Sequence, residues 1–256
     1  MSKTAMVTGA ADGIGKGIAI ELAKNGYDLM IHSGRSEAGA KELAERLSAE
    51  YGIRAFGMGE DLLNPGAPAR IFREFDSHFD HIDLFVNNAG VTEGAPFLEM
   101  TEETFDRVVG IDLKGAFFCT QEAAKRMAEK EIRGNIVIIA SNLREYIMPN
   151  MAVYGPVKAA AARLAKHEAI ELAPYGIRVN AIAPGYVDST ERMQPYKESS
   201  KRNIPLKKWA SVEQVAKLLL HIVSEDGGFF TGSVITMDGG ATLMRDPEYD
   251  FRGNGD

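Results

Sequence analysis

The residues best suited to chemistry are a serine, a tyrosine and a lysine in the second half of the chain. Tyr154 and Lys158 are four residues apart, and Ser141 lies thirteen residues before the tyrosine. On a helix, residues four apart share one face. The ammonium can then favour the phenolate and lower the pKa of Tyr154, while a strand-end serine holds the reacting oxygen. The set predicts proton transfer at a substrate oxygen, although such a pair on a solvated helix face is also common.

The N-terminal segment has the pattern of a turn that binds a dinucleotide pyrophosphate. An apolar run at residues 5–7 leads into Gly-x-x-x-Gly-x-Gly and then into a helical pattern. Glycines let the backbone approach phosphates, and a helix N-terminus offers free N–H groups and a positive dipole end. A chance glycine-rich loop is the alternative in a chain with 26 glycines. The expected cofactor contacts here are Thr8, Gly9, Asp12, Gly13, Ile14 and Gly15.

With these motifs in place, the chain resembles the short-chain dehydrogenase/reductase family over nearly its whole length. The family's motifs occur in the family's order, which makes the resemblance specific. They are Thr8 to Gly15, Asp61-Leu62, Asn87-Asn88-Ala89-Gly90, Ser141, Tyr154, Lys158, Pro184-Gly185 and Asp238-Gly239-Gly240.

The resemblance implies hydride transfer between C4 of a nicotinamide and a carbonyl or secondary alcohol carbon. In that reading Tyr154 is the general acid/base and Ser141 hydrogen-bonds the substrate oxygen. Lys158 binds the nicotinamide ribose and lowers the pKa of the tyrosine. Further cofactor contacts implied by the family are Asp61, Leu62, Asn88, Ala89, Gly90, Pro184, Gly185, Val187 and Ser189.

Two positions depart from the family's pattern. The family's fourth catalytic residue is an asparagine, but this chain has Asp112, which has nearly the same shape and adds a charge near the proton path of Lys158. That charge could leave the relay working or weaken it. Pro156 stands where small residues are usual, and a proline is tolerated in the first turn of a helix. We expect neither departure to remove the catalytic set.

The end of the second expected strand bears on which dinucleotide is bound. NAD-dependent enzymes usually carry an acidic residue there, whereas arginine and small hydroxyl residues suit a 2′-phosphate. This chain has Ser33, Gly34, Arg35 and Ser36, with no carboxylate before Glu37. Against this, many NADP-using relatives have a basic residue where this chain has Asp12. The pattern favours NADP(H) and leaves NAD(H) possible.

The apolar runs alternate with helical patterns, as in a doubly wound α/β fold. Several of the runs are almost wholly apolar, as expected of strands buried on both faces. We expect one Rossmann domain over residues 1–256, with a seven-stranded parallel sheet between helices, a substrate lid at about 189–210 and a polar tail at about 241–256. The expected strands are 5–8, 28–32, 54–58, 84–87, 135–140, 178–183 and 234–237.

Composition narrows the class of protein and the kinds of partner. A length of 256 residues with 45% hydrophobic content can bury one full core. No run approaches the roughly 20 apolar residues of a membrane span, and no signal peptide is visible. A net charge of −7 without a basic block argues against nucleic acid as a partner. Cys119 is the only cysteine, which fits a reducing cytoplasm, and the five histidines show no metal-ligand spacing.

The substrate and the assembly are inferred from weaker patterns. The loop at 142–146 and the segment at 190–204 are polar and charged, which favours a sugar or polyol over a long acyl chain. A 3-oxoacyl-carrier-protein reductase is the alternative activity, and a cofactor-binding regulator the non-catalytic alternative. Helices expected at 101–128 and 152–173 carry Ala123, Ala124, Ala159 to Ala162 and Leu164, which predicts close packing across a twofold axis. The resemblance to the family implies that the assembly is a homotetramer.

Overall fold

The strands of this chain bury side chains on both of their faces. We analysed a computed structural model that describes residues 2–190, 194–195 and 197–243. In β1 (Thr4–Val7), Ala5 and Val7 enter one apolar core, whereas Met6 enters a second core. Successive side chains of a strand point to opposite faces, so each strand contributes to both cores. Such a sheet must be covered by helices on both sides.

Seven parallel strands form the central sheet, in the order β3-β2-β1-β4-β5-β6-β9. The predicted doubly wound sheet is confirmed, and each predicted strand agrees with the observed one to within one residue at either end. The remaining strands are β2 (Asp28–Ser33), β3 (Ala55–Gly59), β4 (Leu84–Asn87), β5 (Asn135–Ile139), β6 (Arg178–Pro184) and β9 (Val234–Met237). A second, two-stranded parallel sheet of β7 (Val187–Asp188) and β8 (Ala210–Ser211) was not expected.

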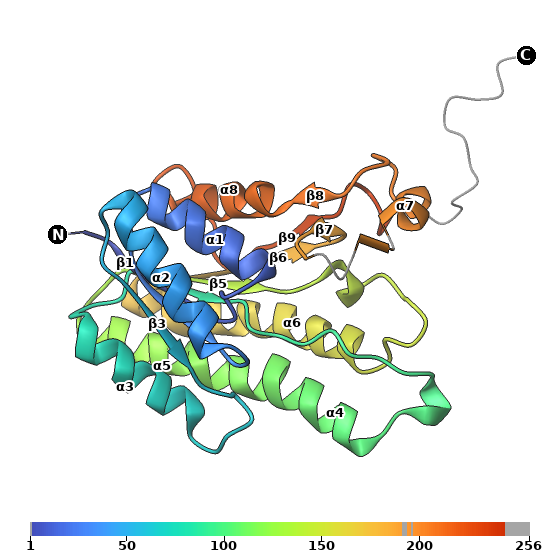
Figure 1. Cartoon of the computed structure of the whole chain (residues 1–256), viewed down its shortest axis with the longest axis horizontal. Coiled ribbons are helices and arrows are strands. Elements are labelled where there is room, and N and C mark those ends of the chain that lie inside the picture. Colours follow the sequence, from blue (N-terminus) through green and yellow to red (C-terminus); the bar gives the residue numbers. More distant parts are fainter. Residues whose placement is uncertain (1, 191–193, 196, 244–256) are drawn as a thin grey trace, which may run out of the picture.

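Helices cover the two faces of the sheet as two layers (Figure 1). One layer holds α1 (Gly13–Lys24), α2 (Glu37–Tyr51) and α8 (Val212–Val223). The other holds α3 (Ala67–His78), α5 (Ala116–Glu129) and α6 (Tyr154–Leu172). Shorter helical segments are η1 (Phe97–Glu99), η3 (Asn142–Arg144), η4 (Ala173–Tyr175), α7 (Lys197–Ser200) and η6 (Lys201–Asn203). Within the described ranges, no helix is both long and apolar enough to cross a bilayer.

The helix expected over residues 101–128 is interrupted. It begins as α4 (Glu102–Val109), continues as a π-helical segment, η2 (Gly110–Gly115), and resumes as α5. Its start is as predicted, because the Thr101 hydroxyl accepts a hydrogen bond from the Thr104 amide. The predicted continuous helix is wrong at residues 110–115. A π-helical turn accommodates an extra residue and is common at functional sites.

Four of the alanines expected at a subunit contact are buried within the chain, whereas Ala159, Ala160 and Leu164 are only partly buried. Ala123, Ala124, Ala161 and Ala162 are buried in the chain's own second core. Small side chains on α5 and α6 let these helices approach the sheet closely, so these four residues do not face outward. Exposed apolar side chains of this layer include the aromatic Phe117 and Phe118 on α5 and the aliphatic Ile170 on α6. Cys119 follows Phe118 in α5 and is buried, and this burial raises the pKa of its thiol to about 12.

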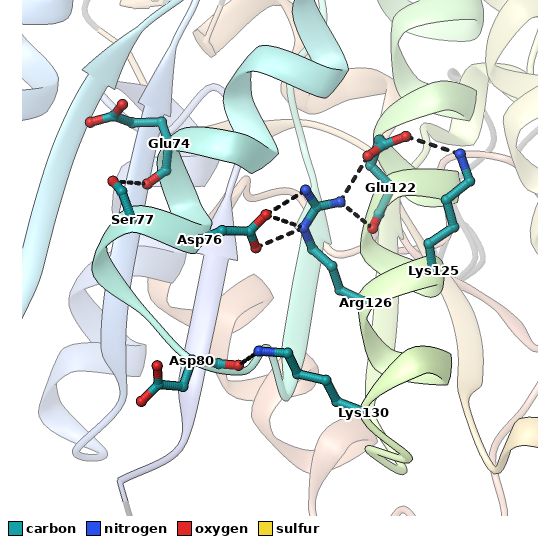
Figure 2. A network of polar contacts seen from close by, with 8 residues as sticks. All are labelled: Glu74, Asp76, Ser77, Asp80, Glu122, Lys125, Arg126 and Lys130. Carbon is teal, nitrogen blue, oxygen red and sulfur yellow. Dashed lines mark hydrogen bonds and ion pairs between the residues drawn. The ribbon is translucent and has the colours of Figure 1, made fainter.

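Charged side chains join α3 to α5 at the outer edge of the molecule (Figure 2). The Arg126 guanidinium donates to both oxygens of Asp76 at 2.6–3.0 Å and to Glu122 at 2.8 Å. Its planar group also lies over the Phe72 ring, 5.1 Å from the centroid. One turn on, the Lys130 ammonium donates to the Asp80 carbonyl. We call Arg126, Asp76 and Glu122 the α3–α5 seam.

Candidate active site

The glycine-rich turn after β1 packs against the turn after β4. The Thr8 hydroxyl accepts hydrogen bonds from the amides of Asn88 and Ala89, both at 3.0 Å. The Asn88 side chain donates back to the carbonyls of Thr8 and Gly9. Because β1 and β4 are neighbours from which the chain runs in opposite directions across the sheet, this junction is the topological switch point where such folds bind nucleotides.

Two of the glycines in this turn are required by close contact. A Cβ at Gly9 would lie 2.8 Å from the Ala89 Cα, and one at Gly15 would lie 2.5 Å from the Gly9 carbonyl oxygen. Gly13 is different: its φ is +60°, and no backbone atom of another segment crowds the place of a Cβ. The N-terminus of α1 therefore lies at the switch point, and a ligand can come close to its backbone at Gly13. This arrangement suits the binding of a pyrophosphate.

Asp12 ends up as the N-cap of α1. Its carboxylate accepts a hydrogen bond from the Gly13 amide at 2.7 Å, and Ile14 follows in the first turn. The carboxylate thus satisfies one of the free N–H groups of the helix. This capping role accounts for an acidic residue at a position where NADP-using relatives often carry a basic one.

Ser141, Tyr154 and Lys158 come from the end of β5 and the start of α6. Ser141 is the N-cap of η3, and its hydroxyl accepts from the Leu143 amide at 3.2 Å. A Cβ at Gly155 would lie 3.1 Å from the Leu143 carbonyl, so the first turn of α6 lies directly against the serine's loop. Tyr154 is the first residue of α6, and the Lys158 ammonium lies 5.5 Å from the centroid of its ring.

Lys158 is held by groups from two other segments, η2 and β5. Its Nζ lies 3.1 Å from Asp112 Oδ2 and donates to the Ile139 carbonyl at 3.2 Å. The side chains of Lys158 and Asp112 are only 7% and 0% exposed. The contact with Asp112 is an ion pair without a well-directed hydrogen bond, because Asp112 Oδ2 has no hydrogen-bond partner among the described residues. Burial lowers the pKa of Lys158, but the charges of Asp112 and Tyr154 outweigh burial and raise that pKa above 10.5.

Asp112 reaches Lys158 because it lies in the π-helical segment. Its Oδ1 accepts from the Val91 amide at 2.7 Å, which ties it to the turn after β4. A Cβ at Gly90 would lie 2.6 Å from Asp112 Oδ2, so a larger residue at this position would push against the carboxylate. The predicted proximity of Asp112 and Lys158 is therefore present.

The other expected cofactor contacts surround the same edge of the sheet. Gly185 follows β6, and its Cβ would lie 2.6 Å from that of Asp238, so the chain bends tightly there. Ser189 lies near Gly13, because a Cβ on that glycine would be 3.9 Å from the serine's Cβ. Two expected contacts, Leu62 and Val187, bury their side chains in the cores and can offer only backbone groups. Pro184 is the last residue of β6.

A pocket of about 380 Å³ lies where β2 and β3 end. It contains the predicted Ser33, Gly34, Arg35 and Asp61, and it also contains Gly59, Glu60 and Asn64, which the sequence reading left out. Gly59 is the last residue of β3 and Glu60 follows it, and this place at a strand end was the available signal for both. The full lining is Ser33, Gly34, Arg35, Ser36, Glu37, Gly59, Glu60, Asp61 and Asn64.

The substrate side of the site is polar near the serine. Asn142 is buried beside Ser141, and its amide lies 3.5 Å from Asp238. Arg144 donates to the Thr236 hydroxyl at 3.0 Å and pairs with Glu145 at 2.5 Å. Of the lid expected at 189–210, residues 191–193 and 196 lie outside the described residues. Trp209 stacks on Tyr186 and donates to Ser200, so it packs against this segment.

No three histidine, cysteine or acidic side chains within the described ranges gather in a way that could hold a metal ion. His78 stacks on Phe56 and contacts Glu74, and His81 contacts Asp83. These contacts give both histidines structural neighbours.

Comparisons with known proteins agree with this geometry. A family model described as enoyl-(acyl carrier protein) reductase matches residues 9–242. The 3-oxoacyl-[acyl-carrier-protein] reductase FabG of Aquifex aeolicus is 36% identical, with 93% of this chain and 96% of the relative covered. The crystal structure of acetoin dehydrogenase from Enterobacter cloacae superposes with a TM-score of 0.89 at 34% identity, covering 98% and 99% of the two chains.

A third likeness is to a short-chain type dehydrogenase/reductase of Mycobacterium marinum, with a TM-score of 0.88 at 31% identity over 94% of this chain and 96% of the other. The family model, the full-length relatives and the solved structures agree on one fold and one class of chemistry. This chain therefore belongs to the short-chain dehydrogenase/reductase family, whose members are oxidoreductases acting on carbonyl and alcohol groups.

Proposed function

We propose that this chain is an NADP(H)-preferring oxidoreductase of small hydroxylated carbonyl compounds, with sugars and polyols as the first class to test. The observation that carries the proposal is Tyr154 at the head of α6 with a buried Lys158 one turn behind it, paired to Asp112. When bound, the nicotinamide would supply or accept the hydride.

The side chains divide the remaining work among them. In the reductive direction Tyr154 gives its phenolic proton to the substrate oxygen, and in the oxidative direction it takes that proton back. The Ser141 hydroxyl already accepts from the Leu143 amide, so its own hydrogen is free to point at the substrate oxygen. The Lys158 ammonium stabilises the phenolate and can bind the nicotinamide ribose. Asp112 keeps that ammonium charged and in place.

The preference for NADP(H) is supported by donors at the adenosine end. The Arg35 guanidinium makes no hydrogen bond or ion pair with any other described residue, so it is available to a phosphate. The hydroxyls of Ser33 and Ser36 accept backbone hydrogen bonds, which leaves their own hydrogens to donate. They lie at the N-terminus of α2, whose dipole favours an anion.

Arg35→Ala tests this preference directly. Loss of a charge-assisted pair should weaken NADPH binding about 10- to 100-fold and leave NADH binding nearly unchanged. Fluorescence titration of both cofactors measures it. Equal binding of NADH and NADPH by the unaltered chain would contradict the preference, and equal loss of both cofactors would show that Arg35 serves the fold.

The substrate class is supported by the polar wall beside Ser141 and by a relative. Acetoin, the substrate named for the Enterobacter cloacae relative, is itself a small hydroxy ketone. The second candidate is reduction of 3-oxoacyl thioesters, favoured by the likeness to FabG. Initial rates of NADPH and NADP turnover with sugars, polyols, acetoin and a 3-oxoacyl thioester separate the two, because only one class should give a high kcat/KM.

Tyr154→Phe tests the catalytic assignment. The ring keeps its packing but has no proton to give, so kcat should fall about 10³-fold while NADPH affinity stays within about threefold. Retention of most activity by a variant that binds cofactor normally would refute the acid/base role.

The assembly is also a proposal. The exposed aromatic side chains Phe105, Phe117 and Phe118 on α4 and α5 offer an apolar face, in place of the alanines first expected there. This face supports a homotetramer of the kind that the family commonly builds. A light-scattering mass equal to one chain at micromolar concentration would contradict it.

A further inference from the structure

The pocket at the ends of β2 and β3 has more carboxylates than an anion site usually tolerates. Glu37, Glu60 and Asp61 line it beside a single cation, Arg35. A phosphate bound there would be repelled by each unpaired carboxylate, and more strongly at short range. The charge of Glu37 is partly compensated by Lys41 at 2.6 Å. Asp61 makes no ion pair within the described ranges, so the state of Glu60 decides whether the pocket holds a further unpaired carboxylate.

Arg70 holds Glu60 with two parallel hydrogen bonds. Its Nε donates to Oε2 at 2.9 Å and its Nη2 to Oε1 at 3.0 Å, a fork that matches the carboxylate geometry. The third nitrogen, Nη1, donates to the Pro65 carbonyl, which fixes the guanidinium. The Asn64 amide donates to the same Oε1 at 2.9 Å. These hydrogen bonds lower the pKa of Glu60 to about 2, so it is ionised and fully engaged.

The backbone of Glu60 is fixed from beneath. The buried His32 ring makes a 2.8 Å hydrogen bond to the Glu60 carbonyl. Burial lowers the pKa of His32, so the ring is neutral and donates through Nε2. The Glu60 amide donates to the Ser33 carbonyl at 3.1 Å. The backbone of Glu60 is therefore fixed, and only its side chain could turn from Arg70 toward the pocket.

We propose that Arg70 is a specificity-determining positioning residue, which engages the Glu60 carboxylate so that the pocket accepts a phosphate on the adenosine ribose. Without this arginine, Glu60 would be an uncompensated carboxylate at the strand end. Such a group would repel a 2′-phosphate, and it could accept hydrogen bonds from ribose hydroxyls, as the acidic residue after the second strand does in NAD-dependent enzymes. The inference rests on the proposed function for the identity of the ligand, and it adds the residue that sets the choice.

The test measures dissociation constants of NADPH and NADH by fluorescence titration for four variants. Arg70→Met should lower the NADPH:NADH affinity ratio about tenfold, mostly through weaker NADPH binding. Glu60→Gln alone should not lower the ratio, because it removes a negative charge and leaves the Arg70 guanidinium unpaired. The double variant should return to within about threefold of the unaltered chain. Arg73→Met is the matched control, because Arg73 lies exposed on the same helix and makes no contact with Glu60.

The rescue by Glu60→Gln separates specificity from folding. An unchanged ratio in Arg70→Met would overturn the proposal, and so would equal loss of both cofactors that Glu60→Gln does not restore. If Arg70→Met unfolds at the assay temperature, Arg70→Lys keeps the charge without the fork and should lower the ratio by a smaller factor. A preference of the unaltered chain for NADH would contradict the proposed function but not this inference. The inference concerns only the direction in which Arg70 shifts the NADPH:NADH affinity ratio.

Discussion

Two ion pairs of this chain have similar chemistry and different surroundings. In the α3–α5 seam, the side chains of Arg126 and Asp76 are 15% and 46% exposed, so water reaches the carboxylate. At the carboxyl edge of the sheet, Lys158 and Asp112 are almost fully enclosed. A pair in contact with water contributes little to stability and loses little when broken. An enclosed pair is costly to bury, and it leaves an uncompensated charge when one partner is removed.

The surroundings of each ion pair indicate its role in the protein. The seam joins two outer helices, and other contacts, such as the Phe72 ring beneath Arg126, share that task. The enclosed pair is a poor way to stabilise a core, since apolar side chains would do so at least as well. Its benefit is positional, because it sets the charge and the place of the ammonium behind Tyr154.

Matched methionine substitutions at the two cations give the largest expected difference. Lys158→Met should lower kcat about 10³-fold and leave Asp112 as a buried, unpaired carboxylate, at a cost of about 3–5 kcal/mol in the free energy of unfolding. Activity assays and urea unfolding at pH 7.5 measure both effects. Lys158→Arg keeps the charge and should recover most of the stability. A fully stable Lys158→Met variant would show that water enters the site.

Glu168 shows what a carboxylate costs where no cation compensates it. Its Oε2 is buried without a hydrogen-bond partner, and burial, aided by Glu171, raises its pKa from 4.5 to about 7. The folded chain thus holds this proton more tightly than the unfolded chain. Stability is unaffected below pH 4.5, falls between pH 4.5 and 7, and stays reduced above pH 7.

Glu168→Gln should therefore stabilise the chain by about 2–3 kcal/mol at pH 8 and by much less at pH 5. Urea unfolding at the two pH values measures the difference. Glu171→Gln, one turn away on the same helix, should give a smaller effect of the same sign, because it removes only the charge that adds to the shift. A pH-independent effect of Glu168→Gln would mean that the carboxylate is solvated or paired.

Asp112→Asn removes one charge from the enclosed pair and nearly keeps the shape. The amide oxygen can still accept from the Val91 amide, and the negative field that opposes ionisation of the Tyr154 phenol is gone. The basic limb of the alcohol oxidation profile should move toward lower pH by about one unit. Rates of oxidation against pH for both proteins give the answer. An unmoved limb would mean that Asp112 is uncoupled from the tyrosine, and an inactive variant that the carboxylate has a further role.

The smallest effect is expected at the seam. Arg126→Met keeps an apolar side chain over Phe72 and leaves Asp76 accessible to water, so the free energy of unfolding should fall by only about 1 kcal/mol. kcat and KM should not change, and 0.5 M salt should narrow the stability difference. A loss comparable to that of Lys158→Met would remove the distinction between the two pairs.

The parts of the fold that could be predicted from sequence are those whose burial leaves a pattern. Strands such as β4 and β5 are apolar on both faces, so their runs are continuous and their ends are sharp. The nucleotide turn could be predicted because close contacts require glycine at fixed positions. The spacing of Ser141, Tyr154 and Lys158 could be predicted because helix periodicity puts the last two on one face. The helix start at Thr101 could be predicted because the free N–H groups of a first turn favour a threonine cap.

Other features depend on contacts between distant segments and left no local pattern. The fork between Arg70 and Glu60 joins residues ten apart across a turn. The outward direction of Phe117 and the inward direction of Ala123 follow from how α5 meets the sheet. Nothing in the residue types at 110–115 distinguishes a π-helical turn from an ordinary helical one. For this reason the neighbours of Asp112 could be expected, but the turn that brings it there could not.

That turn makes the active site sensitive to chain length. A π-helical turn corresponds to one residue more than an α-helix of the same span holds. Deleting a single residue from Gly110–Gly115 would allow α4 and α5 to join as one regular helix, with their packing faces still directed at their present neighbours. The deletion would relieve an irregular stretch of backbone and at the same time withdraw Asp112 from Lys158. In this segment a shortened chain can gain regularity while it loses its chemistry.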